Sequence, residues 1–161
     1  MKKIGLISDT HNFLHPKINH YFKNCDEVWH AGDIGDYTII EQLENKNIRG
    51  VYGNIDGKDI RLTFPKELNF QIEKINVYIT HIGGSPNKYS KEIIEKIKTK
   101  KPDLVICGHS HILKVMYDNA NQHLFINPGA AGKYGAHQKK TIIRFEINED
   151  KIENLEVIEL K

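Results

Sequence analysis

The first stretch of the chain with metal-binding chemistry is Ser8-Asp9-Thr10-His11, which ends a short apolar run that starts at Lys2. Asp9 and His11 are two residues apart, and in an extended chain such side chains point to the same side. A carboxylate and an imidazole that leave a strand end together can hold one cation. A single Asp-x-His pair is weak support for a metal site, so this hypothesis requires further ligands at the same edge.

Other residues of ligand type follow later apolar runs, each next to a glycine or a small polar residue. They are Asp33 after Gly32, Asn54 after Gly53, His81 after Thr80, and His109 and His111 after Gly108. Each alone has an ordinary explanation as a turn, cap or loop residue. Turns, caps and loops do not readily explain why five apolar runs all end in this way. Together these runs indicate one site with seven candidate ligands.

The elements that must position these residues alternate in type through the first third of the chain. Short apolar strands are expected over 3–8, 27–30 and 48–52, with amphipathic helices over 16–24 and 37–46 between them. This order predicts a parallel, doubly wound α/β sheet. The carboxyl ends of strands in such a sheet converge on one crevice, where ligands bind.

The pattern changes in the second half. Alternation over 68–72 and 77–79 predicts a hairpin with residues 74–76 between its strands, and a helix follows over 90–100 with Ser90 as its N-cap. Further strands are expected over 104–107, 112–117, 123–126, 141–147 and 151–160. The longest irregular stretches are 54–65, 83–87 and 128–139. No linker or repeat interrupts the pattern, so we expect one domain over residues 1–161.

Composition limits the class of protein. The chain has 161 residues, 39% hydrophobic and 27% charged, with a net charge of +2, which is typical of a globular domain and gives no case for broad nucleic-acid or membrane attraction. No run approaches the roughly 18 to 20 apolar residues of a spanning helix, and the start is too short for a signal peptide. Cys25 and Cys107 form no CxxC motif and are expected to be reduced, buried thiols. We therefore expect a cytoplasmic protein, and homo-oligomer formation is left open.

Seven ligands exceed what one ion usually takes, and they suit two ions with a bridging carboxylate and water. The mixture of carboxylate, imidazole and amide favours manganese, with nickel, iron, zinc or cobalt as alternatives, over magnesium or calcium. Two divalent ions carry four positive charges, of which Asp9 and Asp33 offset two and a bridging hydroxide one more. The remaining positive charge matches the negative oxygens of a phosphoryl group.

These motifs, in this order, resemble those of the calcineurin-like metallophosphoesterases. The small size resembles that family's single-domain bacterial and archaeal phosphodiesterase branch, which is also similar to the retromer subunit of vacuolar sorting. The match runs from Ile4 to about Gly132. The resemblance implies a four-layer α/β/β/α sandwich, in which two mixed sheets are flanked by helices and a di-metal site lies at the C-terminal strand ends.

The resemblance also implies residue roles. The first metal would be held by Asp9, His11, Asp33 and His111, and the second by Asp33, Asn54, His81 and His109. The solvent that bridges the metals would attack phosphorus in line with the leaving group, without a covalent enzyme intermediate. Asn54 and His109 are assigned a catalytic role that acts through this hydroxide.

The motif around Asn54 departs from that of the wider family. In the family this motif is often Gly-Asn-His followed by an acidic residue, whereas in this chain it reads Gly53-Asn54-Ile55-Asp56. The family's histidine contacts the phosphate and is thought to protonate the leaving group, and Ile55 can do neither. The general acid is therefore unassigned. Loss of general acid catalysis typically lowers the rate about 10² to 10⁴-fold for poor leaving groups, so we expect good leaving groups such as nitrophenolate to be favoured.

Several nearby residues have open interpretations. His15 and His137 can replace the missing acid, although ordinary surface positions are preferred for both. Asp56 is either an acceptor that orients a ligand histidine or a simple turn residue. The loop over 127–130 is interpreted as a wall of the site, and Trp29 as packing between helix and sheet.

The leading hypothesis is a metal-dependent phosphoesterase, most of all a phosphodiesterase that acts on small-molecule or nucleotide phosphoesters. The alternative is a metal-binding scaffold without physiological catalysis. The alternative is favoured by Ile55 and needs an apolar patch, for which Tyr117, Phe125 and Val157 are candidates. A nuclease is less favoured, because the sequence shows no basic groove.

Overall fold

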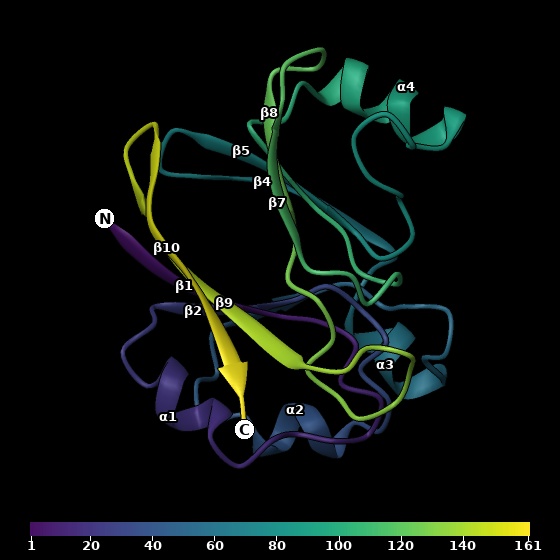
Figure 1. Cartoon of the computed structure of the whole chain (residues 1–161), viewed down its shortest axis with the longest axis vertical. Helices are drawn as coiled ribbons and strands as arrows, with labels where there is room; N and C mark the ends of the chain where they lie inside the picture. Colours follow the sequence, from purple (N-terminus) through teal and green to yellow (C-terminus); the bar gives the residue numbers. More distant parts are fainter.

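A computed structural model describes all 161 residues and shows two five-stranded sheets packed face to face, with helices on their outer sides (Figure 1). Three helices contribute buried side chains to a core on the outer face of one sheet: α1 (Ile18–Phe22), α2 (Thr38–Gln42) and α3 (Lys58–Thr63). Helix α4 (Lys91–Lys100) contributes to a core on the outer face of the other sheet. A third core fills the space between the sheets. The four-layer sandwich with mixed sheets is therefore confirmed.

The first sheet has the strand order β10-β9-β1-β2-β3. Its strands are β1 (Lys2–Ile7), β2 (Glu27–His30), β3 (Ile48–Gly50), β9 (Lys140–Asn148) and β10 (Lys151–Leu160). Strands β1, β2 and β3 are parallel, whereas β9 is antiparallel to both β1 and β10. The parallel β1-β2-β3 unit is the part of the fold that alternation along the chain predicted.

The two helices that connect these parallel strands lie on the same face of the sheet. Helices α1 (Ile18–Phe22) and α2 (Thr38–Gln42) share one apolar core through Ile18, Phe22 and Ile39. A doubly wound sheet would have helices on both faces, so that expectation is wrong. The physical reason is that the second sheet already covers the other face.

The second sheet has the order β4-β5-β6-β8-β7. Its strands are β4 (Glu67–Ile72), β5 (Ile75–Thr80), β6 (Leu104–Ile106), β7 (Lys114–Asp118) and β8 (His123–Asn127). The predicted hairpin is β4–β5, but its turn is shorter than expected, because Ile72 pairs directly with Ile75. Helix α4 (Lys91–Lys100) begins as predicted, with the Ser90 hydroxyl accepting a hydrogen bond from the Ile93 amide.

Trp29 lies between the two sheets, where its ring meets Phe70 and Phe145 edge to face. Its neighbour on β2, Val28, points to the helix layer. Successive residues of a strand face opposite sides, so Trp29 faces the second sheet. The expectation that it packs between helix and sheet is therefore wrong, for the same reason as the doubly wound sheet.

Helix α3 (Lys58–Thr63) lies inside the stretch that was expected to be irregular. It has no apolar periodicity and buries one side chain, Ile60, which explains why the sequence did not reveal it. None of the four helices combines the length and apolarity that crossing a bilayer requires. Both cysteines are free as expected, but only Cys107 is fully buried, and Cys25 is half-buried.

Candidate metal centre

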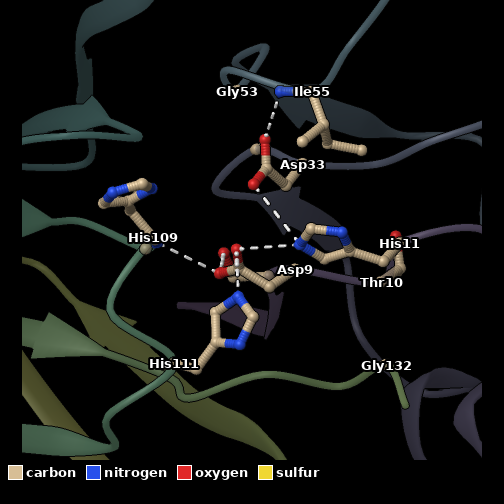
Figure 2. A network of polar contacts seen from close by, with 12 residues as sticks. Asp9, Thr10, His11, Asp33, Gly53, Ile55, His109, His111 and Gly132 are labelled. Atoms are coloured by element: carbon tan, nitrogen blue, oxygen red, sulfur yellow. Dashed lines mark hydrogen bonds and ion pairs between the residues drawn. The ribbon is translucent and has the colours of Figure 1, made fainter. Parts of the chain in front are cut away.

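Three of the predicted ligands, Asp9, His11 and His111, form one cluster at the ends of β1 and β6. The His111 Nε2 atom is 3.2 Å from Asp9 Oδ1, and His11 Nε2 is 3.7 Å from the same oxygen. Figure 2 shows Asp9 between these two imidazoles. One ligand atom from each residue lies within 4.8 Å of the others, which is close enough to hold one ion.

Asp33, His81 and His109 form a second cluster with ligand atoms within the same 4.8 Å limit. Asn54 belongs with it, because its Oδ1 atom is 3.1 Å from both His81 Nε2 and His109 Nδ1. The residues come from the loops after β2, β3, β5 and β6. The structure thus assembles strand ends that are up to 76 residues apart in the chain.

Asp33 connects the two clusters. Its Oδ2 atom is 3.3 Å from His11 Nε2 of the first cluster (Figure 2). The same oxygen is 3.1 Å from His81 Nε2 of the second cluster. Its other oxygen accepts a hydrogen bond from the Ile55 amide. All seven predicted ligands therefore meet in one place, with one carboxylate oxygen between the two groups.

The unpartnered atoms of the centre fit divalent cations. Asp9 Oδ1 and His11 Nε2 are buried and have no hydrogen-bond partner, an arrangement that costs free energy unless a further group satisfies them. His81 Nδ1 is 2.7 Å from the Ala31 carbonyl oxygen, to which it donates, so the Nε2 lone pair faces the site. Imidazole nitrogens and carboxylate oxygens aimed at common points are the ligands that borderline divalent ions prefer.

The charges of the centre are strongly coupled. Burial alone would raise the pKa of the Asp9 carboxyl, but its contacts with His11 and His111 hold it well below the usual range. Burial likewise opposes the ionisation of Asp33, whose pKa is nevertheless lowered by His81. The pKa of His81 is raised, because Asp33 and Asp9 outweigh the effect of its burial. The centre therefore keeps its carboxylates ionised at neutral pH, as metal ligands must be.

The loops that carry the ligands have unusual backbone conformations. Asp9, His11, Asp33, His109 and His111 all have φ between 44° and 72°. Side chains other than glycine rarely adopt these values, and such strain concentrates at functional sites. Gly32 has φ of 102°, and a Cβ atom there would lie only 2.6 Å from His81 Nδ1, so the glycine before Asp33 allows the imidazole of the other sheet to approach.

His30 is a part of the centre that the sequence did not reveal. It is fully buried in β2, its Nε2 atom is 3.1 Å from Thr10 Oγ1, and its Nδ1 atom accepts a hydrogen bond from the Gly32 amide. The Thr10 hydroxyl donates to Ile34 O, so Nε2 carries the proton and donates to Thr10. Burial lowers the pKa of His30 to about 3, and the neutral ring ties the loop of Asp9 to the loop of Asp33. A histidine that follows Val28 and Trp29 and stands directly before Ala-Gly-Asp was the available signal.

Asn127 supports the loop of His109 and His111. Its side-chain amide donates to Gly108 O and Ser110 Oγ, both at 3.1 Å. The interpretation of this loop as a mere wall of the site missed this contact. An Asn that ends an apolar run, directly before Pro-Gly, was its signal in the sequence.

Asp56 does not orient a ligand histidine. Its buried carboxylate accepts hydrogen bonds from the Gly35 amide at 2.8 Å and the Gly53 amide at 2.7 Å. It joins the loops that carry Asp33 and Asn54, so the interpretation as an acceptor for histidine is wrong. Both partners are backbone groups, which sequence patterns do not identify.

The two histidines considered as replacement acids lie in different surroundings. His137 donates from Nε2 to the Gly132 carbonyl oxygen at 2.7 Å, and its ring centroid is 5.1 Å from that of His111. His15 is only 9% exposed and packs edge to face against Phe13. The expectation of an ordinary surface position is therefore wrong for His15, and His137 lies beside the first cluster.

The chain is similar to known phosphoesterases. Residues 1–150 match the family model described as the calcineurin-like phosphoesterase superfamily domain. A probable metallophosphoesterase of Methanocaldococcus jannaschii is 28% identical over 135 residues, which are 79% of this chain and 67% of the relative.

Two solved structures extend the comparison. An archaeal phosphodiesterase is 28% identical with a TM-score of 0.75, over 97% of this chain and 99% of the other. Vps29 of Entamoeba histolytica, complexed with zinc, has a TM-score of 0.71 at 16% identity, over 99% of both chains, which shows a shared fold. The two Asp/His clusters and the two-sheet fold accord with these matches, and the chain belongs to the calcineurin-like phosphoesterase superfamily.

Proposed function

We propose that this protein is a metal-dependent phosphodiesterase that acts on small-molecule or nucleotide phosphoesters. The observation that carries the proposal is the position of Asp33 Oδ2, which is 3.3 Å from His11 Nε2 and 3.1 Å from His81 Nε2. If two ions are bound, the Asp33 carboxylate, which faces a nitrogen from each cluster, would be shared between them. Two-metal sites are widely used in phosphoester hydrolysis, and the similarity to an archaeal phosphodiesterase supports the diester preference.

The residues of the centre differ in burial, and their expected roles differ accordingly. Asp9 and His81 are buried and would hold the ions from the protein side, with His81 oriented by its hydrogen bond to the Ala31 carbonyl oxygen. Asn54 and His109 are exposed, so they face an incoming substrate. When bound, two divalent ions, manganese as first choice, would supply an activated water and neutralise the negative charge of the phosphoryl group.

The site has no histidine at the position of the family's proton donor. Ile55 is 44% exposed at the rim, and its amide is bonded to Asp33 rather than free for substrate (Figure 2). We therefore expect faster turnover of esters whose leaving group needs no proton, such as nitrophenolate. A cavity of about 250 Å³ beside His109, whose lining includes Gly83, Ser85 and Ser110, can receive one ester substituent.

The test combines metal content with hydrolysis of bis(p-nitrophenyl) phosphate. Wild-type protein purified with manganese should hold about two ions per chain by elemental analysis and should release nitrophenolate. Asp33→Asn should lose most of the bound metal and at least about 10²-fold in rate, because it removes the bridging charge. Asp150→Asn, in an exposed turn, removes the same charge away from the site and is the matched control. Equal activity of the two variants would refute the proposal.

A metal-binding scaffold remains the second candidate, and exposed apolar residues favour it. Leu113, Val115 and Tyr117 are exposed on or next to the edge strand β7, and Val157 is exposed on β10, whereas Phe125 is buried under α4. Phe125 is therefore removed from the expected patch. Wild-type protein that binds two ions but hydrolyses no diester or monoester in a broad panel would favour this candidate over the phosphodiesterase.

A further inference from the structure

A cavity of about 250 Å³ opens beside the second cluster. Two of the predicted ligands, Asn54 and His81, form part of its wall, together with Arg61 and Lys66. The remaining lining residues are Tyr52, Gly53, Thr80 and Ile82. No carboxylate lines the cavity, although it borders the centre of the proposed site.

The Arg61 side chain is held in a defined orientation. Its Nε atom donates to the Asp56 carbonyl oxygen at 2.6 Å, and its guanidinium carbon lies 4.3 Å from the centre of the Tyr52 ring. The hydrogen bond uses one of five N–H groups, so the two terminal nitrogens keep their donors. A guanidinium oriented in this way loses little freedom when it binds an anion.

Arg61 is the one arginine of the chain without a carboxylate partner. Arg49 pairs with Glu27, and Arg144 pairs with Glu156. Lys66 also forms no ion pair. Two unpaired cations in a cavity without acidic groups attract anions, and the planar guanidinium matches the oxygens of a phosphate.

We propose that this cavity binds a second phosphate of the substrate, so that the preferred substrate is a phosphodiester with a further phosphate on one substituent. The inference rests on the proposed function, in which the reacting phosphate lies at the ions beside Asn54 and His81. A phosphate is favoured over a carboxylate, because two cations face the cavity and match a dianion. Arg61 and Lys66 would then select the substrate without touching the reacting atoms.

Binding tests the proposal without catalysis. Calorimetry on the manganese-loaded protein would compare thymidine 5′-phosphate with thymidine 3′,5′-bisphosphate, which differ by one phosphate. We expect the bisphosphate to bind about tenfold more tightly to wild type, and this ratio to fall to about twofold or less in Arg61→Gln and in Lys66→Gln. Arg49→Gln is the matched control, since its guanidinium also stacks on an aromatic ring at 4.3 Å, above Phe70, and does not line the cavity.

Three results would overturn the inference. They are equal binding of the two nucleotides by wild type, a ratio unchanged in both cavity variants, and an equal loss of affinity for both nucleotides in Arg61→Gln. The third result would mean that Arg61 contacts the phosphate that the two ligands share.

Hydrolysis separates this inference from the proposed function. The p-nitrophenyl ester of thymidine 5′-phosphate, with and without a 3′-phosphate, releases the same chromophore. We expect kcat/KM to be about tenfold higher for the ester with the 3′-phosphate and the preference to shrink in Arg61→Gln. If neither ester is hydrolysed, the proposed function fails, and the binding ratio still decides whether the cavity takes a phosphate.

Discussion

His30 makes the free energy of unfolding depend on pH in a direction that the structure determines. The buried ring has a pKa of about 3, compared with 6.5 for a free histidine. Below pH 6.5 the unfolded chain therefore binds a proton that the folded chain does not bind. The stabilising contribution is complete above pH 6.5 and is lost as the pH falls towards 3.

The magnitude follows from proton linkage. The unfolded histidine is half protonated at pH 6.5 and almost fully protonated at pH 4.5, so one such histidine lowers the free energy of unfolding by about 2 kcal/mol over this range. In His30→Asn, the shorter side chain keeps an oxygen near the Gly32 amide, loses the contact with Thr10, and cannot take up a proton. We expect the variant to be about 1 to 3 kcal/mol less stable at pH 7.5.

Urea unfolding at pH 7.5, 6.5, 5.5 and 4.5, in the presence of a chelator, measures the effect. Trp29 is the only tryptophan and is fully buried, so its fluorescence reports the transition. The advantage of wild type over His30→Asn should shrink by about 2 kcal/mol between pH 6.5 and 4.5. His20→Asn, at an exposed position of α1, is the matched control. A constant difference between wild type and His30→Asn over this range would refute the assignment of a buried, neutral His30.

Two further changes test the centre and its rim. Ile55→His restores the imidazole of the wider family, and we expect it to accelerate methyl p-nitrophenyl phosphate little but dimethyl phosphate by about 10²-fold; an equal effect on both esters would exclude a role in protonating the leaving group. Gly132→Ala would place a methyl group against the carbonyl oxygens of Asp9 and Thr10, and we expect a loss of about 1 to 3 kcal/mol in urea unfolding together with weaker metal binding. Gly57→Ala, where a Cβ meets nothing within 4 Å, is its control, and equal stability of the two variants would contradict the steric argument.

Local features of the sequence predicted most of the strands, and they placed a residue of metal-ligand type directly after five of them. Each apolar run is followed within a few residues by a side chain that can bind a metal, so this pattern can be recognised without knowledge of the fold. The same applies to α4, whose apolar spacing and Ser90 cap are local. Helix α3 has neither signal, because Ile60 is its only buried residue.

The tertiary structure was required to show which side of a sheet each residue faces and which groups form its hydrogen bonds. The identity of the layer above β1, β2 and β3 depends on a second sheet, whose strands all come later in the chain, from Glu67 onwards. This is why the surroundings of Trp29 and the faces of the helices were predicted wrongly. The partners of His30 and Asp56 include backbone amides from other loops. Such contacts depend on how loops approach one another and leave no pattern along the chain.

The sequence alone thus determined which seven side chains are of metal-ligand type and follow a strand, since residue type and position after a strand are local properties. Only the tertiary structure decided that Asp33 lies between the two clusters and that Arg61 and Lys66 line a cavity beside them. The physical reason is that distances across a site arise from the packing of two sheets and their loops, whereas the chemistry of each ligand belongs to the residue itself.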